Sequence, residues 1–216
     1  MGDTNIVCNI ELYKMKVNEI FKSIQGEGRF AGTPVLFVRL SGCNRSCRFC
    51  DTKYHIENDN HSVEDMAGFI NDSRMNIVVW TGGEPLLQIK DIKKVIELTK
   101  TKIHHLETNG DKLFKGDKLY EVFNYICCSP KSVLTTRRIH KHKAFYLGRL
   151  DMKIISSGRD FASEMLTYAD YVMPLTTNND ISNDEIKKTV WMYCVMYDKK
   201  FCLRQHVEVW GNKKGV

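Results

Sequence analysis

The chain has 216 residues, of which 43% are hydrophobic and 27% charged, and its formal net charge is +6. This composition excludes a disordered chain, and the length suits a single domain over residues 1–216. The sequence has neither an apolar run of about 18 residues nor a signal pattern at residues 1–5, so we expect a cytoplasmic protein without a membrane segment. The positive charge falls short of that of a dedicated nucleic-acid binder and suits an anionic small substrate.

The first informative segment is a strand-like run, residues 18–24, that leads into the turn Gln25-Gly26-Glu27-Gly28. Glycine there permits positive φ and the close approach of a ligand, although an ordinary hairpin turn has the same composition. A second turn precedes the apolar strand 35–40, which contains Arg39. A buried arginine needs an anionic partner, and the partner of Arg39 would be either an internal carboxylate or the carboxylate of a ligand.

Three cysteines, Cys43, Cys47 and Cys50, follow that strand on one short loop. Thiolates so closely spaced can hold one compact metal centre. A zinc site needs a fourth ligand, commonly from a second Cys or His pair, and none stands nearby in the sequence. A [4Fe–4S] cluster held by three thiolates leaves one iron open to bind a small molecule. Structural or disulfide-bonded cysteines are the alternative, which this spacing and a reducing compartment disfavour.

Helical and strand patterns alternate through the rest of the chain. Ser62 and Ser182 each precede a helical pattern with acidic residues in its first turn, which is typical of a capped helix. The alternation predicts an α/β fold on parallel strands, whose carboxyl ends meet at one edge. Polar or glycine-rich segments follow six predicted strands, and we expect them to form one active site after Leu40, Trp80, Leu106, Cys128, Ile155 and Met173.

Two other segments carry no visible chemistry. The densest basic run, Arg137 to Lys143, predicts a solvated loop, and a contact surface for an anionic partner is the alternative. The segment from Trp191 to Cys202 is rich in apolar residues and is expected to serve packing.

Several motifs stand in a fixed order along the chain. The cysteine spacing, with Phe49 directly before the last cysteine, and the motif Thr81-Gly82-Gly83-Glu84-Pro85 resemble the radical S-adenosylmethionine (SAM) superfamily. In that motif two glycines let the backbone reach the amino group of the methionine moiety. Further stretches complete the pattern: Glu19 to Gly28, Gly32-Thr33-Pro34, Phe37 to Asn44, Cys50-Asp51-Thr52, Glu107-Thr108-Asn109-Gly110, Ser129-Pro130-Lys131 and residues 206–216. Together they resemble the 7-carboxy-7-deazaguanine synthase family over nearly the whole chain.

That resemblance implies an α/β fold, a partial (trimmed) TIM-like parallel β/α barrel of the radical SAM type. It implies that Cys43, Cys47 and Cys50 hold a [4Fe–4S] cluster and that Thr52 ligates Mg²⁺. It implies SAM contacts at Phe49, Cys50, Asp51, Gly83, Ser129, Pro130 and Lys131, and substrate contacts at Ile24, Gln25, Gly26, Arg39 and Thr81, with Arg39 facing a carboxylate. Glu107 and His206 are further candidates: the carboxylate of Glu107 would either pair with the N–H edge of a pterin or cap a local turn.

The implied reaction converts 6-carboxy-5,6,7,8-tetrahydropterin to 7-carboxy-7-deazaguanine with loss of ammonia, which makes the protein a carbon–nitrogen lyase. SAM acts as a cofactor, and its 5′-deoxyadenosyl radical does the chemistry, so no side chain is expected to act as a catalytic acid or base. The resemblance also implies a homodimer and a reductant such as flavodoxin or ferredoxin. A tRNA base and a DNA base are both open as the destination of the 7-deazapurine.

Two other functions fit parts of the pattern. The glycyl-radical activating enzyme of anaerobic ribonucleotide reductase shares the cysteine motif, but it acts on a protein partner and gives no reason for residues 23–28 or Thr52. A non-catalytic binding module on the same fold would use Arg137 to Lys143 as its contact surface, but it would not need an intact cysteine loop.

Overall fold

The computed structural model describes residues 14–50, 59–113, 118–177, 180–211, 213 and 215. In this part of the chain nine strands form one sheet, in the order β3-β1-β2-β4-β5-β6-β7-β8-β9. β1 pairs antiparallel with both β2 and β3, and the strands from β2 to β9 are parallel to one another. The bounds are β1 (Met15–Ile24), β2 (Pro34–Leu40), β3 (Asp59–His61), β4 (Ile77–Gly82), β5 (Ile103–Thr108), β6 (Tyr125–Cys128), β7 (Leu150–Ser156), β8 (Tyr171–Pro174) and β9 (Lys200–Phe201).

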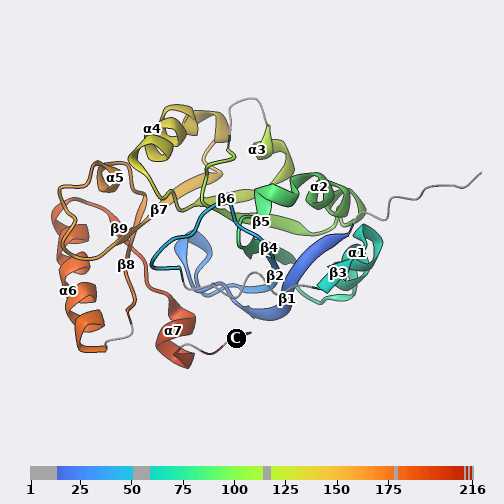
Figure 1. Ribbon diagram of the computed structural model, residues 1–216, viewed down its shortest axis with the longest axis horizontal. Coiled ribbons are helices and arrows are strands. Elements are labelled where there is room, and N and C mark those ends of the chain that lie inside the picture. The colour runs from blue at the N-terminus through green and yellow to red at the C-terminus, as the bar shows by residue number, and fades with distance from the viewer. Residues whose placement is uncertain are drawn as a thin grey trace, which may run out of the picture.

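Helices connect most of the parallel strands. They are α1 (Val63–Asp72), α2 (Ile89–Leu98), α3 (Leu119–Val122), α4 (Val133–His142), α5 (Glu164–Thr167), α6 (Asp180–Met196) and α7 (Gln205–Trp210), with short 3₁₀ turns η1 (Gly28–Phe30), η2 (Pro85–Gln88) and η4 (Lys143–Tyr146). Figure 1 shows α2, α3 and α4 along one side of the curved sheet, with α6 beyond β8 and β9 and α7 on the other side. The sheet is open, and it agrees with the partial barrel expected from the sequence.

The two faces of the sheet differ in chemistry, because successive side chains of a strand point to opposite faces. The outer face is apolar and packs with the helices in one core, which includes Val78, Trp80, Leu106, Ile126, Met152, Ile70, Ile92, Val95 and Ile139. The alternate positions of β5, β6 and β7 carry Glu107, Cys127, Asp151 and Lys153. Of these, Cys127, Asp151 and Lys153 are buried, so the inner face holds ionisable groups away from water. Buried ionisable groups need partners, so we expect other elements of the fold to supply them.

The predicted parallel strands are confirmed, with ends that differ by one or two residues. Ser62 caps α1 as predicted: its hydroxyl accepts from the Asp65 amide at 3.0 Å, and the Asp65 carboxylate accepts from the Ser62 amide at 3.4 Å. The cap predicted at Ser182 is wrong, because α6 begins two residues earlier, at Asp180. Between β7 and β8 the connection contains only the single helical turn of α5.

The basic run is helical, so the solvated loop predicted there is wrong. It forms the second half of α4, which Ser132 caps by accepting from the Thr135 amide at 3.3 Å. Arg137, His140 and Lys141 are exposed, and Arg137 pairs with Glu164. By contrast, the half-buried Arg138 side chain donates to the carbonyls of Gly110 and Asp111 at 2.8 Å and 2.9 Å, and Lys143 pairs with Asp170. Charge density alone misled the prediction, since a solvated helix face and a solvated loop have the same composition.

No helix in the described ranges combines the length and the apolar character that a membrane crossing requires.

Candidate active site

The cysteine loop leaves the carboxyl end of β2 and lies at the edge where the parallel strands end. Cys43, Cys47 and Cys50 are free, half-buried thiols, and the Cys50 amide closes a turn on the Cys47 carbonyl at 3.1 Å. Partial burial raises the pKa of Cys43. Within the described residues, no three His, Cys, Asp or Glu side chains converge on the position of a single metal ion. Three accessible soft ligands on one loop are a donor set that fits an iron–sulfur cluster.

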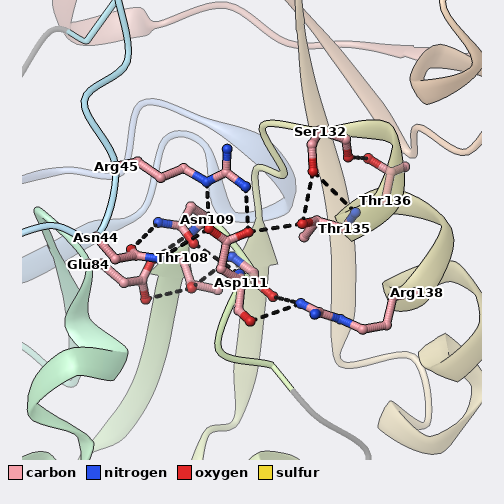
Figure 2. Close-up of polar contacts among 11 residues, drawn as sticks. Asn44, Arg45, Glu84, Thr108, Asn109, Asp111, Ser132, Thr135, Thr136 and Arg138 are labelled. Atoms are coloured by element: carbon pink, nitrogen blue, oxygen red, sulfur yellow. Dashed lines mark hydrogen bonds and ion pairs between the residues drawn. The ribbon is translucent and has the colours of Figure 1, made fainter.

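Asp111, in the loop after β5, anchors the cysteine loop (Figure 2). The guanidinium of Arg45, which lies between the first two cysteines, donates to both oxygens of Asp111, at 2.5 Å and 2.7 Å. The side-chain amide of Asn44 and the Thr135 hydroxyl donate to the same carboxylate at 3.1 Å and 2.9 Å. The hydrogen bond from Arg45 lowers the pKa of Asp111. Asp111 therefore joins the cysteine loop to the start of α4.

Glu84, from the glycine-rich motif, is fully buried and braces two further loops. Its carboxylate accepts from the Leu86 amide at 3.0 Å, the Thr108 hydroxyl at 2.7 Å and the Asn109 amide at 2.8 Å. Burial raises the pKa of this carboxyl group. The Asn109 side chain in turn donates to Asn44 at 2.9 Å, so the network returns to the cysteine loop (Figure 2).

The two glycines of the motif have a further reason beside the one expected from the sequence. The Gly83 amide donates to the Leu40 carbonyl at 2.9 Å, and the next amide donates to Gly42 at 2.8 Å, so the loop after β4 lies directly on the start of the cysteine loop. A Cβ on Gly83 would lie 1.9 Å from the Gly42 carbonyl oxygen, and one on Gly82 would lie 2.1 Å from the Leu40 oxygen. Backbone-to-backbone packing alone therefore requires glycine at both positions.

The residues predicted to contact SAM gather on three loops at this edge. Phe49 is 49% exposed, and the Lys131 ammonium lies 5.7 Å from the centre of its ring. Lys131 also donates to the Ser129 hydroxyl at 2.9 Å, and the neighbouring Pro130 is buried. Cys50 belongs to the cysteine loop, and Gly83 packs against the start of it. Asp51 and Thr52 lie outside the described residues.

The residues predicted to contact the substrate divide into two groups. Arg39 and Thr81 are register neighbours on β2 and β4, close to the cysteine loop. The Arg39 guanidinium pairs with Glu19 on β1 at 2.9 Å, so of the two partners considered for it, the internal carboxylate is present. Gln25 and Gly26 are buried in the β1–β2 hairpin, whereas the side chain of Ile24 is 43% exposed.

The β1–β2 hairpin covers the inner face of the sheet. Arg29 donates to both oxygens of Asp151 on β7, at 2.9 Å and 2.7 Å. Phe30 packs on the rings of His105 and Tyr125, with centroid separations of 4.4 Å and 4.9 Å. The Tyr125 hydroxyl donates to the same Asp151 carboxylate at 2.8 Å. These contacts close one end of the inner face against water.

Helix α7 reaches the same hairpin from the other end of the chain. The Gln205 amide donates to the Gly26 carbonyl at 3.1 Å, and a Cβ on Gly26 would lie 2.7 Å from Nδ1 of His206. The structure thus brings His206, a candidate from the sequence, beside Gly26, so the last helix helps to enclose the inner face.

Lys153 is a site residue that the sequence reasoning missed. Its side chain is buried on the inner face and pairs with Glu27 and with Glu107, the latter at 3.0 Å. The signal was present in the sequence: a lysine stands within the apolar strand 150–155, as Arg39 stands within β2. Burying an unpaired ammonium is costly, so such a lysine predicts carboxylate partners from other elements.

Comparison with known proteins identifies the class. The model of the radical SAM superfamily matches residues 37–145. The crystal structure of QueE from Escherichia coli superposes with a TM-score of 0.64 and 22% identity, covering 89% of this chain and 95% of that one. A native anSMEcpe structure with bound AdoMet and a peptide has a TM-score of 0.57 and 13% identity, covering 81% and 65%. These likenesses confirm the fold expected from the sequence: this is a radical SAM protein.

Sequence relatives narrow the class. The 7-carboxy-7-deazaguanine synthase of Hyperthermus butylicus is 34% identical, over 75% of this chain and 77% of the relative. Those of Bacteroides thetaiotaomicron and Thermoplasma acidophilum are 34% and 33% identical, over 84% and 76% of their own lengths. The chain belongs to the 7-carboxy-7-deazaguanine synthase family and is an enzyme of the radical SAM type. Neither the activating enzyme nor the binding module considered above is favoured.

Proposed function

We propose that this chain converts 6-carboxy-5,6,7,8-tetrahydropterin to 7-carboxy-7-deazaguanine with loss of ammonia, as a single domain in the cytoplasm. The observation that carries the proposal is the position of Arg39 and Thr81, which are paired in register on β2 and β4, with Arg39 four residues before Cys43. A cationic group and a hydroxyl group so close to the cysteine loop suit a small anionic substrate. The names of the relatives give the product, 7-carboxy-7-deazaguanine.

The residues proposed to bind the cofactors lie on the loops that follow the parallel strands. Cys43, Cys47 and Cys50 would hold a [4Fe–4S] cluster, and SAM would bind at Phe49, Cys50, Asp51, Gly83, Ser129, Pro130 and Lys131. When bound, the two together supply the 5′-deoxyadenosyl radical that starts the rearrangement. The protein's own contribution is to orient these loops through Asp111 and Glu84.

The residues proposed to contact the substrate would bind it and enclose it. Arg39 would face the substrate carboxylate, and because Glu19 already holds one edge of its guanidinium, little side-chain freedom remains to be lost on binding. Thr81 would contact the substrate beside Arg39, and residues 24–26 would contact it from the side of the hairpin. Because the side chain of Ile24 is exposed to solvent, residue 24 would contribute through its backbone. The hairpin keeps water from the reacting atoms.

Mg²⁺ is a further part of the proposal. Its expected ligand, Thr52, lies outside the described residues. A hydroxyl oxygen suits this hard cation, which keeps its other positions for water and substrate oxygens. A metal titration of chelator-treated enzyme tests this part: product formation should rise with Mg²⁺ in the native chain and respond weakly in Thr52→Val. Equal response in both would remove Thr52 from the site.

Two macromolecular partners are proposed. Large apolar side chains on α6 are 56–71% exposed, which suits a second copy of the chain: Trp191, Met192, Val195 and Met196. Light scattering should give the mass of a dimer for the native chain and of a monomer for Met196→Glu, and a monomeric native chain would reject the dimer.

The second partner is a one-electron reductant of the flavodoxin or ferredoxin kind, for which the exposed Arg48 beside the cysteines offers a cationic contact.

The reaction itself is tested without oxygen. Iron–sulfur-reconstituted protein is incubated with SAM, a reductant, Mg²⁺ and 6-carboxytetrahydropterin, and the products are analysed by mass spectrometry. We expect 7-carboxy-7-deazaguanine from the native chain, none from Cys47→Ala and less from Arg39→Ala. Cleavage of SAM with the pterin left intact would overturn the proposed substrate while leaving the family membership unaffected.

A further inference from the structure

A buried ion cluster joins the β1–β2 hairpin to the inner face of the sheet. Lys153, only 3% exposed, donates to a carboxylate oxygen of Glu27 and, at 3.0 Å, to Oε2 of Glu107. The other oxygen of Glu107, Oε1, accepts from the Gln25 side-chain amide at 3.3 Å. Each oxygen of Glu107 therefore has a donor of its own, and both donors come from other elements of the fold.

The charges of this cluster do not cancel. Burial by itself lowers the pKa of Lys153, but the neighbouring carboxylates of Glu107 and Glu27 outweigh burial and raise the pKa well above its usual value. Burial also raises the pKa of the Cys127 thiol well above its usual value, so this thiol stays neutral. Burial raises the pKa of the Glu107 carboxyl group, and the Lys153 ammonium opposes that rise. Among these three side chains, two ionised carboxylates facing one ammonium leave a single net negative charge. Such a charge is stabilised by a ligand that brings N–H donors.

The position of this charge suits one end of the proposed substrate. A carboxylated tetrahydropterin has a carboxylate at one end and, at the other, the N–H donors of its 2-amino-4-oxo ring. The inner face offers the matching pair: Arg39 near the cysteine loop, and the Glu107 carboxylate beside Gln25. This assignment rests on the function proposed above.

We propose that Lys153 is a positioning residue for substrate selection: it holds the Glu107 carboxylate where that group accepts from the N–H edge of the pterin ring. Lys153 acts through Glu107 and does not touch the substrate. It also neutralises Glu27, so that the hairpin closes without placing two unbalanced carboxylates side by side.

The test separates positioning from charge balance. Lys153→Met leaves two buried carboxylates without a cation and can prevent folding, so the informative variant is the double substitution Lys153→Met/Glu27→Gln. That protein keeps one net negative charge, because one cation and one anion leave together. Lys143→Met is the matched control, since it also breaks a half-buried lysine–carboxylate pair, with Asp170, away from the hairpin.

The measurements are the KM and kcat for 6-carboxytetrahydropterin and the discrimination against its 2-oxo (lumazine) analogue, which lacks the amino group. In the double variant we expect KM to rise about 10- to 100-fold with kcat within about threefold, which corresponds to one lost charge-assisted hydrogen bond. Discrimination against the 2-oxo analogue should fall by a similar factor. Lys143→Met should leave both quantities unchanged.

Other outcomes overturn the inference. Native KM and native discrimination in the double variant would show that Lys153 only balances charge. A loss of kcat with unchanged KM would place its role outside substrate binding. A native enzyme that cleaves SAM but leaves the pterin intact would instead refute the proposed function, so the two failures are distinguishable.

Discussion

Asp111→Ala removes a carboxylate that Arg45, Asn44 and Thr135 share, and it should loosen the cysteine loop before any cluster binds. Hydrogen bonds to a charged group are worth about 1.5–3 kcal/mol each when buried. Here the Arg45 and Asp111 side chains are 28% and 20% exposed, and the three donors act as one group, so their energies do not add. We expect a loss of about 2 kcal/mol of unfolding free energy.

The assay is urea unfolding of the cluster-free protein, together with amide hydrogen exchange over residues 43–50. We expect the loop in Asp111→Ala to exchange faster than in the native chain and to take up less iron on reconstitution. Arg137→Gln is the matched control: it breaks an arginine–carboxylate pair that is solvent-exposed, and its stability should change little.

The reasoning would be refuted by an Asp111→Ala protein whose stability falls by less than about 0.5 kcal/mol and whose loop exchanges at the native rate. Such a result would mean that the cysteine loop is held by its own turn and by the glycine-rich loop, without the anchor.

Three further predictions concern single positions. Gly83→Ala should fail to bind iron or fail to fold, because its Cβ would lie 1.9 Å from a backbone oxygen of Gly42; a native iron content on reconstitution would contradict this. Gly26→Ala should raise the KM for the pterin with only a small loss of stability, because its Cβ would push the side chain of His206 away from the hairpin. Steady-state kinetics report the first effect and a thermal melting curve reports the second. Burial lowers the pKa of His104 to about 4, so the folded protein keeps it neutral while the unfolded chain protonates it near its usual 6.5. The stability that a neutral His104 provides is therefore complete above about pH 6.5 and is lost as the pH falls towards 4. Between about pH 7.5 and about pH 5, the unfolding free energy measured in urea should fall by about 2 kcal/mol less in His104→Gln than in the native chain. An equal fall in both proteins would refute the assignment.

Local patterns determined much of this protein. The alternation of apolar strands with amphipathic helices was enough to predict the parallel strands β2, β4, β5, β6, β7 and β8, because a buried strand and a half-buried helix have different periods. The capping box at Ser62 and the cysteine spacing are also local, and each depends on residues only a few positions apart. Prediction failed where a local pattern fits two structures. The basic run, predicted as a loop, lies in α4, and α6 begins before Ser182, which was predicted to cap it.

Only the tertiary structure decided which distant residues meet. Lys153 pairs with Glu27 from 126 positions away and with Glu107 from 46, and no spacing rule links them. The glycines of the motif around Gly83 proved to be required by the neighbouring loop as well, since parallel β2 and β4 bring two backbones into contact. The physical reason is common to these cases: a side chain's period along its own strand is set by the local sequence, whereas its partner across the sheet depends on the order in which the strands pair.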